Sequence, residues 1–339
     1  MKEFGSDFHY IKNLNIAEKT IEYFYPTAIF YALGRHALLD LYLKSGWKRL
    51  WVPEYFCYDV LDMLKREGVN LEFYKDYPLA DDEKTIRSLR FSDGDALLRM
   101  NFFGLRSWRS NKGIPVPVIE DHTHDLIGHW AENSDADWCI ASLRKTLPLA
   151  EGGVLWSPKN HKLQGGIEST IENEMTAEKR WSAMRKKTMY LNDEINNKES
   201  FRTDMITTEE SFNKLEISAL DGLTSDFLKE FDVVQWYNEK KRNWGFLSEI
   251  SDNSFKVLQP EREECNPFSM TLLFREAHDR NLFRDRLIAS GVYPAILWTV
   301  LDSCSKDVKE FSNKMLSLHC DSRYNAEDVI ALQEIIAGR

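Results

Sequence analysis

The hydrophobic pattern of this chain alternates between two periods along most of its length. Short apolar runs, which indicate buried strands, are followed by stretches whose apolar residues recur at helical spacing. This alternation predicts a mainly parallel sheet between helices, because a return to a parallel strand needs a helical crossover. We expect strands at residues 49–52, 69–74, 96–104, 116–119, 138–141 and 154–156, and helices at 37–43, 60–66 and 80–92.

The second half of the chain is more polar and more helical. Residues 172–191 and 209–247 have helical character, with a weak span at 192–208 between them. A change of composition at residues 251–267, rich in Asp, Asn, Pro and Glu, marks the expected domain boundary. Beyond it we expect strands at 269–274 and 315–319, and helices at 280–290 and 326–336, the last capped by Asn325. We therefore predict an N-terminal arm and large domain at 1–250 and a small domain at 251–339.

Composition narrows the classes of function. A chain of 339 residues suits two domains, and 43% hydrophobic with 29% charged residues is typical of a globular protein. The net charge of −10, with no basic face to offset it, argues against nucleic acid or an anionic membrane as the main partner. Five cysteines without C-x-x-C spacing argue against a disulfide framework or a zinc ribbon. Because the N-terminus also has no targeting pattern, we expect a cytoplasmic protein without membrane attachment.

Candidate chemistry concentrates in residues 115–156. Asp121 follows one expected strand, and Lys145 follows the next strand along the chain. Ligands of open α/β sheets bind at such strand ends. A carboxylate there would keep a pyridine nitrogen protonated, and a lysine desolvated in a pocket is neutral often enough to form a Schiff base with an aldehyde. This pair fits pyridoxal phosphate (PLP), whose protonated ring is an electron sink.

Two motifs carry a resemblance to a known family. The segments Glu120-Asp-His-Thr-His124 and Ser142-Leu-Arg-Lys145-Thr-Leu-Pro-Leu-Ala-Glu-Gly-Gly153 resemble the core signature of the DegT/StrS-type (DegT/DnrJ) sugar aminotransferases. The family pattern has an acid, then Gln or His three residues later, then the Schiff-base lysine, and Glu-Gly-Gly six residues beyond it. All three spacings recur here. The resemblance implies the fold-type I PLP transferase architecture: a large α/β domain with a mainly parallel sheet between helices, and a smaller C-terminal α/β domain.

The resemblance also implies roles for individual residues. Lys145 would form the Schiff base, Asp121 would pair with the pyridinium nitrogen, and His124 would lie beside the ring or its phenolic oxygen. A glycine turn opening a helix exposes unpaired N–H groups that can bind an anion, and an arginine adds charge suited to phosphate. The phosphate cup would accordingly consist of Gly34, Arg35, His36 and Ser142, and the ring would stack on Phe56 or on its neighbour Cys57.

The family's usual substrate is a keto sugar linked to a nucleotide, with glutamate or glutamine as amino donor, and its members form homodimers. The family's PLP-dependent sugar dehydratases have histidine at the position of Lys145, so this residue favours amine transfer. The family motif Gly-x-Asn-x-Arg, whose Asn helps to hold the neighbouring subunit's phosphate, does not occur in residues 160–250. Two alternatives therefore stay open: a PLP-dependent lyase or dehydratase, and a non-catalytic PLP-binding relative.

Other chemistries fit the sequence less well. His122 and His124 have the H-x-H spacing of zinc hydrolases, with His129 following, but the di-metal pattern H-x-H-x-D-H is not met. We therefore expect no metal. A G-x-S-x-G elbow and a G-x-G-x-x-G turn are both missing, which argues against a serine hydrolase and a Rossmann oxidoreductase.

Overall fold

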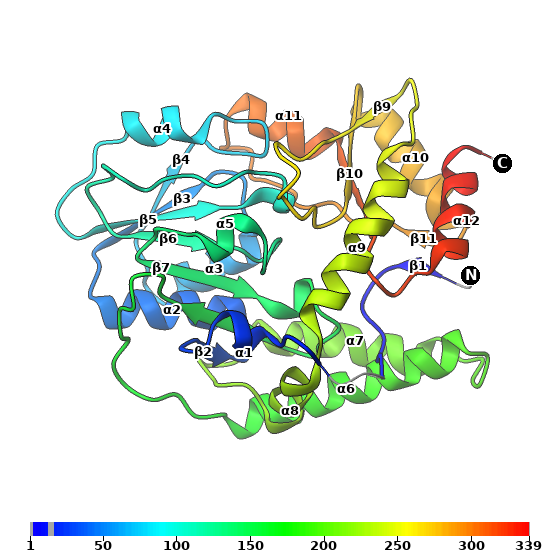
Figure 1. Cartoon of the computed structure of the whole chain (residues 1–339), viewed down its shortest axis with the longest axis horizontal. Helices are drawn as coiled ribbons and strands as arrows, with labels where there is room; N and C mark the ends of the chain where they lie inside the picture. The colour runs from blue at the N-terminus through cyan, green and yellow to red at the C-terminus, as the bar shows by residue number, and fades with distance from the viewer. Residues whose placement is uncertain (1–2, 13–16, 339) are drawn as a thin grey trace.

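A seven-stranded sheet lies at the centre of the larger part of the chain (Figure 1). The structure is a computed structural model that describes residues 3–12 and 17–338. The strands of this sheet are β2 (Ile29–Tyr31), β3 (Arg49–Pro53), β4 (Leu71–Tyr74), β5 (Asp95–Met100), β6 (Val118–Asp121), β7 (Trp138–Ser142) and β8 (Gly153–Trp156). They lie in the order β2-β8-β7-β6-β5-β3-β4. The strands from β4 to β7 pair in parallel, whereas β8 pairs antiparallel with both β7 and β2.

Successive residues of these strands enter two different hydrophobic cores. On β7, for example, Ile140 packs in one core and Cys139 in the other, because side chains alternate across a strand. The first core is covered by α2 (Gly34–Ser45), α3 (Tyr58–Arg66) and α11 (Lys306–Lys314). The second is covered by α1 (Ile21–Phe24), α5 (His129–Glu132), α6 (Ile171–Leu191), α7 (Glu199–Phe212), α8 (Gly222–Glu230) and α9 (Val233–Ser248). Helix α4 (Asp82–Ser88) lies beside β4 at the edge of the sheet.

A smaller unit packs beside the large sheet, on the right in Figure 1. Its antiparallel sheet has the order β12-β10-β9, and all three strands follow residue 250. The expected division between residues 250 and 251 stays a prediction. The elements of this unit are β9 (Phe255–Val257), β10 (Met270–Phe274), α10 (Ala277–Ala289), β11 (Val292–Tyr293), β12 (Met315–Leu318) and α12 (Ala326–Ile336). Asn325 caps α12 in a capping box with Asp328, which confirms the expected cap.

Three expectations about helices and strands are wrong. Residues 209–247 do not form one helix, because the side chains of Asp221 and Asp232 accept backbone N–H groups and start α8 and α9. The span expected to be weak contains most of α7 instead. The strand expected at 96–104 ends at Met100, and the turn that follows holds Phe103 at φ 56°.

The N-terminal arm packs against both parts of the chain. Strand β1 (Phe4–Gly5) pairs in parallel with β11. Beyond it, Lys187 of α6 donates to Ser6 Oγ at 2.6 Å. Figure 1 shows the arm passing between α6 and the small unit, with both chain ends on the same side of the molecule.

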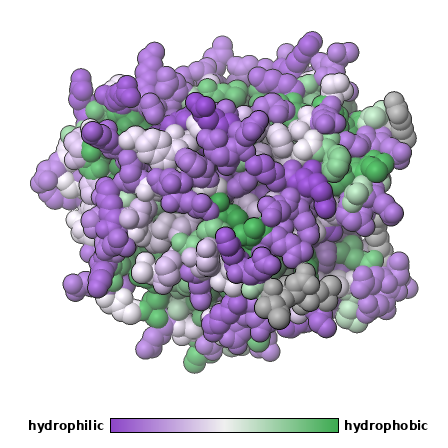
Figure 2. Space-filling view, in the orientation of Figure 1, coloured by the Kyte–Doolittle hydropathy of each residue, from purple (hydrophilic) through white to green (hydrophobic). Residues whose placement is uncertain are grey.

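The surface in Figure 2 is largely hydrophilic, with small separate hydrophobic areas. Among the residues that the structure describes, every helix is too short or too polar to cross a bilayer.

Candidate active site

The neighbouring strands β6 and β7 bring the predicted site residues together. They run in parallel, so their C-terminal ends, at Asp121 and Ser142, lie at the same edge of the sheet. A one-turn 3₁₀ helix follows β7 and ends at Lys145. A cavity of about 280 Å³ opens at this edge. Seven of the eight predicted cofactor-binding residues line it: Gly34, Arg35, Phe56, Asp121, His124, Ser142 and Lys145.

Asp121 presents a buried carboxylate to the cavity. Its side chain is almost inaccessible to water, and burial raises the pKa of the carboxyl group. The backbone N–H of Thr123 donates to Oδ1 at 2.8 Å, which fixes the orientation of the carboxylate. Because a buried carboxylate is stabilised by a cation beside it, this position suits a protonated ring nitrogen.

Lys145 presents an amine whose charge is disfavoured. The neighbouring guanidinium of Arg144, and then partial desolvation, lower the pKa of Lys145. Glu209 acts in the opposite direction, since its Oε1 atom lies 3.9 Å from Nζ. The side chain of Lys145 remains 48% accessible, so a ligand can reach the amine. A lysine with these properties can act as a nucleophile towards an aldehyde.

Arg144 and Glu209 form a two-pronged ion pair at the wall of the cavity. The guanidinium donates to both carboxylate oxygens, at 2.8 and 2.6 Å. Burial acts to raise the pKa of Glu209, but Arg144 and Lys145 together hold it well below its usual range. Sequence reasoning missed Glu209, because this residue lies more than 60 positions beyond the lysine and no motif marks it.

The imidazole of His124 is held neutral in the cavity wall. Its Nδ1 atom accepts the backbone N–H of Phe103 at 2.9 Å. Burial, followed by the charges of Lys240 and Lys145, lowers the pKa of His124 to about 3. The neutral ring therefore carries its proton on Nε2. Phe103 stacks on this imidazole at 5.3 Å, and Trp298 of the small unit stacks at 5.5 Å.

Helix α2 begins at the other side of the cavity. Leu33 precedes it without a side-chain cap, so the start of a helix faces the cavity, and such a start is suited to an anion. A Cβ atom on Gly34 would lie 3.0 Å from Ser142, so only glycine fits here without displacement. Arg35 lines the cavity and donates to the side-chain oxygen of Asn213. Gly34, Arg35 and Ser142 therefore lie together where a phosphate could bind.

The structure places the ring of His36 outside the cavity lining. The residue is only 1% exposed, and its backbone N–H already donates to Leu33 O at 3.0 Å. Burial, and then the charge of Arg35, lower the pKa of His36 to about 4. A neutral, enclosed imidazole adds no positive charge for a phosphate. His36 is thus the one predicted site residue that is not brought to the others.

Thr123 connects the two strand ends, and sequence reasoning missed it. Besides the bond from its N–H to Asp121, its Oγ1 accepts the N–H of Ser142 at 2.9 Å. Its carbonyl oxygen accepts the hydroxyl of Thr146 at 2.6 Å. The acid and the lysine turn are therefore fixed relative to each other through one residue.

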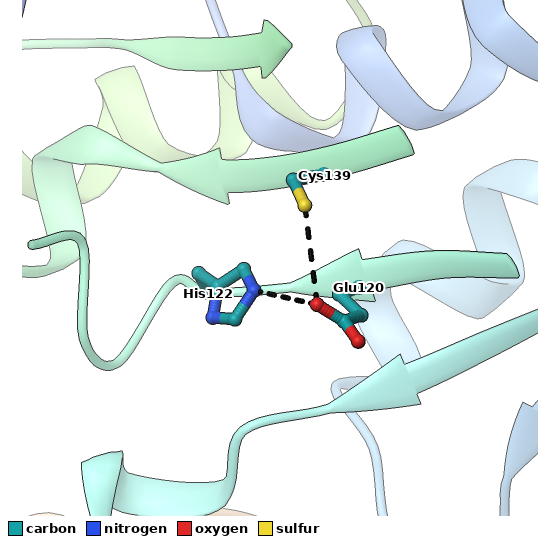
Figure 3. A group of neighbouring side chains, drawn as sticks. All are labelled: Glu120, His122 and Cys139. Atoms are coloured by element: carbon teal, nitrogen blue, oxygen red, sulfur yellow. Dashed lines mark hydrogen bonds and ion pairs between the residues drawn. The ribbon is translucent and has the colours of Figure 1, made fainter. Parts of the chain in front are cut away.

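The two histidines of the H-x-H motif point to different places. Figure 3 shows His122 beside Glu120 and Cys139. His122 Nε2 lies 3.1 Å from Glu120 Oε2, and Cys139 Sγ lies 4.0 Å from the same oxygen. His124, in contrast, lines the cavity. The two imidazoles therefore do not converge on one metal ion.

The buried group around Glu120 is a hydrogen-bonded network. Asn111 Nδ2 donates to Oε1 of Glu120 at 2.7 Å, and the hydroxyl of Ser134 donates to Oε2 at 2.6 Å. Burial raises the pKa of Cys139 well above its ordinary value, which keeps the thiol protonated. Both carboxylate oxygens therefore have protein partners and the thiol carries its proton, whereas Nδ1 of His122 is buried without a hydrogen-bond partner among the described residues.

Comparison with known proteins gives structural likeness alone. No protein-family model and no curated protein matches the sequence. PseC of Helicobacter pylori, an aminotransferase involved in the biosynthesis of pseudoaminic acid, is 14% identical, with a TM-score of 0.67 over 99% of each chain. The PLP-form of Spr1654 from Streptococcus pneumoniae is 12% identical, with a TM-score of 0.64 over 98% of this chain and 97% of that one.

A third structure, DesI in the presence of its TDP-sugar product, is 14% identical, with a TM-score of 0.62 over 91% of this chain and 79% of DesI. Identities this low carry information on the fold only. The likenesses extend over almost the whole chain, including the small unit. They confirm the predicted fold class, and the chain has the fold-type I α/β architecture of the aminotransferase PseC.

Proposed function

We propose that this chain is a PLP-dependent aminotransferase of the DegT/StrS type. The observation that carries the proposal is the placement of Lys145 and Asp121 in one cavity at adjoining strand ends. An amine with a lowered pKa and a buried carboxylate are the two groups that an aldehyde-bearing pyridine needs. The fold shared with PseC supports the same proposal.

The residues present fit PLP. Gly34 leaves room for a close approach at the start of α2, and Arg35 and Ser142 lie beside it for the phosphate. When bound, PLP would supply an electron sink for the pair left behind when a proton leaves the substrate carbon. Phe56 lies in the lining for stacking on the ring.

Each residue then has a defined task. Asp121 would keep the ring nitrogen protonated, because its buried charge is stabilised by a cation beside it. His124 would offer its Nε2 proton to the phenolic oxygen of the ring. Lys145 would hold the cofactor through its aldehyde, and the free amine of this lysine would accept a proton from the substrate and return it. Arg144 and Glu209 hold the lysine turn in place and balance the charge around Nζ.

The substrate in this proposal is a keto sugar linked to a nucleotide, with glutamate or glutamine as amino donor. The resemblance in the two motifs supports this, as does the description of DesI with a TDP-sugar product. A cytoplasmic enzyme of polysaccharide or secondary-metabolite biosynthesis follows. Lys145 separates this function from the sugar dehydratases of the family, which have histidine at that position.

The proposal includes a homodimer. Ile171 and Met175 lie one turn apart on α6 and are 70% and 67% exposed, and Ile206 on the adjacent α7 is 50% exposed. Such exposed apolar side chains on one pair of helices favour burial against a second copy. The N-terminal arm, in contrast, packs on its own chain, through Lys187 and strand β11.

The experiment that tests the function is a half-reaction. The protein loaded with PLP is mixed with glutamate, and the absorbance band of the lysine-bound cofactor is followed together with release of 2-oxoglutarate. We expect the band to disappear as the pyridoxamine form appears, with one 2-oxoglutarate released for each cofactor converted. If neither glutamate, glutamine nor any other common amino acid changes that band, the aminotransferase proposal is wrong.

A further inference from the structure

A second cavity lies directly beside the cofactor cavity. It has a volume of about 430 Å³, and Arg144, Lys145, Phe268 and Leu297 line both cavities. Lys145 therefore lies in the wall that the two cavities share. A molecule in the second cavity could therefore reach the amine.

Three separate parts of the chain form the remaining walls of the second cavity. The arm contributes Ser6, Asp7 and Phe8, α6 contributes Arg180 and Met184, and the small unit contributes residues that include Ser317 and His319. Small-molecule sites commonly lie where domains meet. The position of this cavity is therefore that of a substrate site, completing a pair with the cofactor cavity.

The charged side chains that a ligand can reach in this cavity are mainly the carboxylate of Asp7 and the amine of Lys145. The side chain of Asp7 is 54% accessible, whereas those of Arg180 and Arg144 are only 6% and 5% accessible. Partial desolvation acts to raise the pKa of Asp7, but Arg180 and Lys187 lower it below its ordinary value. A ligand entering the cavity therefore meets an ionised carboxylate rather than a guanidinium.

Asp7 is held in position by several contacts. Arg180 Nη2 donates to Oδ1 at 2.8 Å, and Arg180 is itself fixed by a bond of 2.6 Å to the carbonyl oxygen of Met205. The backbone carbonyl of Asp7 accepts Lys187 Nζ at 2.5 Å and Arg323 Nη1 at 3.2 Å. A side chain supported in this way is preorganised for binding, since little freedom is lost when a ligand arrives.

We propose that the second cavity receives the carbon skeleton of the substrate, and that Asp7 accepts hydrogen bonds there from its hydroxyl groups. The inference rests on the proposed function and adds a residue that discriminates between its two substrates: Asp7 would favour a polyhydroxylated molecule with no negative charge on the part that faces it. A carboxylate accepts hydrogen bonds from hydroxyls strongly, and it repels other carboxylates. The amino donor glutamate, an anion, would therefore bind against this charge rather than with its help.

The variant Asp7→Asn should therefore affect amino sugars and glutamate differently as amine substrates. Asparagine keeps the shape and an oxygen for Arg180 but removes the charge. We expect the conversion of the cofactor band by amino sugars, tested with glucosamine and a TDP-linked amino sugar, to need about tenfold higher concentration of amine. Conversion by glutamate should become several-fold faster or stay unchanged. Binding is measured from the spectral change at increasing amine concentration.

Asp204→Asn provides a matched control. Asp204 also pairs with cations of α6, Lys179 at 3.4 Å and Lys186 at 3.2 Å, but it does not line the cavity. This variant should respond to both kinds of amine like the wild type. Thermal unfolding of both variants checks that the arm and α6 remain folded.

The outcomes separate this inference from the proposed function. If no amine changes the band of the wild type, the proposed function itself fails, and this inference with it. If glutamate converts the cofactor but no amino sugar does, or if Asp7→Asn affects both amines equally, only the assignment of the second cavity is overturned. Weaker binding of the amino sugars together with faster or unchanged conversion by glutamate, seen in Asp7→Asn and not in Asp204→Asn, supports it.

Discussion

Gly34 lies so close to Ser142 that a Cβ atom on the glycine would be 3.0 Å from the Cα, Cβ and backbone nitrogen of the serine. The first residue of α2 is therefore packed directly against the turn that carries Lys145. Because the helix start and the lysine turn are in contact, their relative position does not depend on flexible side chains. A side chain added at Gly34 should therefore displace Ser142, which lines the cofactor cavity.

Gly34→Ala should weaken PLP binding by about tenfold and lower the free energy of unfolding by about 1–3 kcal/mol, because Ser142 has to move by a few tenths of an ångström. Titration of the cofactor-free protein with PLP measures the first effect, and thermal unfolding measures the second. Gly245→Ala, in α9, is the control. Its added Cβ would meet nothing within 4 Å, so we expect a gain of about 0.5–1 kcal/mol in the free energy of unfolding. Equal PLP affinity in Gly34→Ala and the wild type would contradict the close packing.

Lys145→Ala should abolish the borohydride-reducible bond to PLP and leave the protein folded. About half of the lysine side chain is accessible, and its removal also relieves repulsion from Arg144, so we expect a stability change within about 0.5 kcal/mol. Mass spectrometry after reduction detects the bond. Lys159→Ala, at a lysine paired with Asp137 outside the cavity, should retain it. Insoluble Lys145→Ala protein would show that the lysine has a structural role.

Asp121→Asn should retain PLP but lose turnover by about a hundredfold or more, because the charge that stabilises the protonated ring is gone. The cofactor-free variant should be at least as stable as the wild type at pH 7. Burial raises the pKa of Asp121, so its contribution to stability is present below the unfolded pKa of 3.8 and is lost as the pH rises. Unchanged turnover would remove Asp121 from the mechanism.

His36→Leu should make the protein less sensitive to acid. The pKa of His36 is lowered from 6.5 to about 4 in the folded state. Between these values the unfolded state binds a proton that the folded state does not, so stability falls as the pH falls through this window. The loss in free energy of unfolding from pH 7 to pH 4 should be smaller by up to about 3 kcal/mol in the variant. Denaturant unfolding at both pH values measures it, and identical losses would contradict the expectation.

Light scattering should give the wild type twice the 39.7 kDa mass of the chain at micromolar concentration. Ile171→Glu combined with Met175→Glu should produce a monomer with unchanged circular dichroism, because both side chains are exposed within the chain itself. Glu230→Gln, elsewhere on the helical surface, serves as the control. A monomeric wild type would refute the dimer.

The sequence predicted those parts of the site that depend on local order. Asp121, His124, Ser142 and Lys145 lie within 25 residues, and the strands between them have clear apolar runs, so their convergence followed from the parallel sheet. The cap at Asn325 was likewise a local signal. The caps at Asp221 and Asp232 are equally local signals. The helix expected at 209–247 nevertheless runs across both of them and joins the end of α7 to α8 and α9.

Residues from distant segments could not be predicted in this way. Glu209, Trp298 and Asp7 reach the two cavities only because α7, the small unit and the arm pack against the sheet. No spacing in the sequence encodes those contacts. His36 shows the opposite case: its neighbours Gly34 and Arg35 line the cavity, but the turn of the helix directs its ring into the interior.

The arm also determines when the site can be completed during synthesis. The backbone N–H of Gly5 donates to the hydroxyl of Tyr324 at 2.7 Å, a contact that joins residues 319 positions apart. When the ribosome has released the large domain, α6 can already contact Ser6 and Asp7, but the segment around Tyr324 has not yet been made, so the start of the arm lacks one of its two partners. The cofactor cavity can form first, whereas the contacts of the arm are complete only after the segment around Tyr324 has emerged. Contacts this far apart along the chain are slow to form, and the arm is therefore expected to be among the last segments to acquire protection from hydrogen exchange.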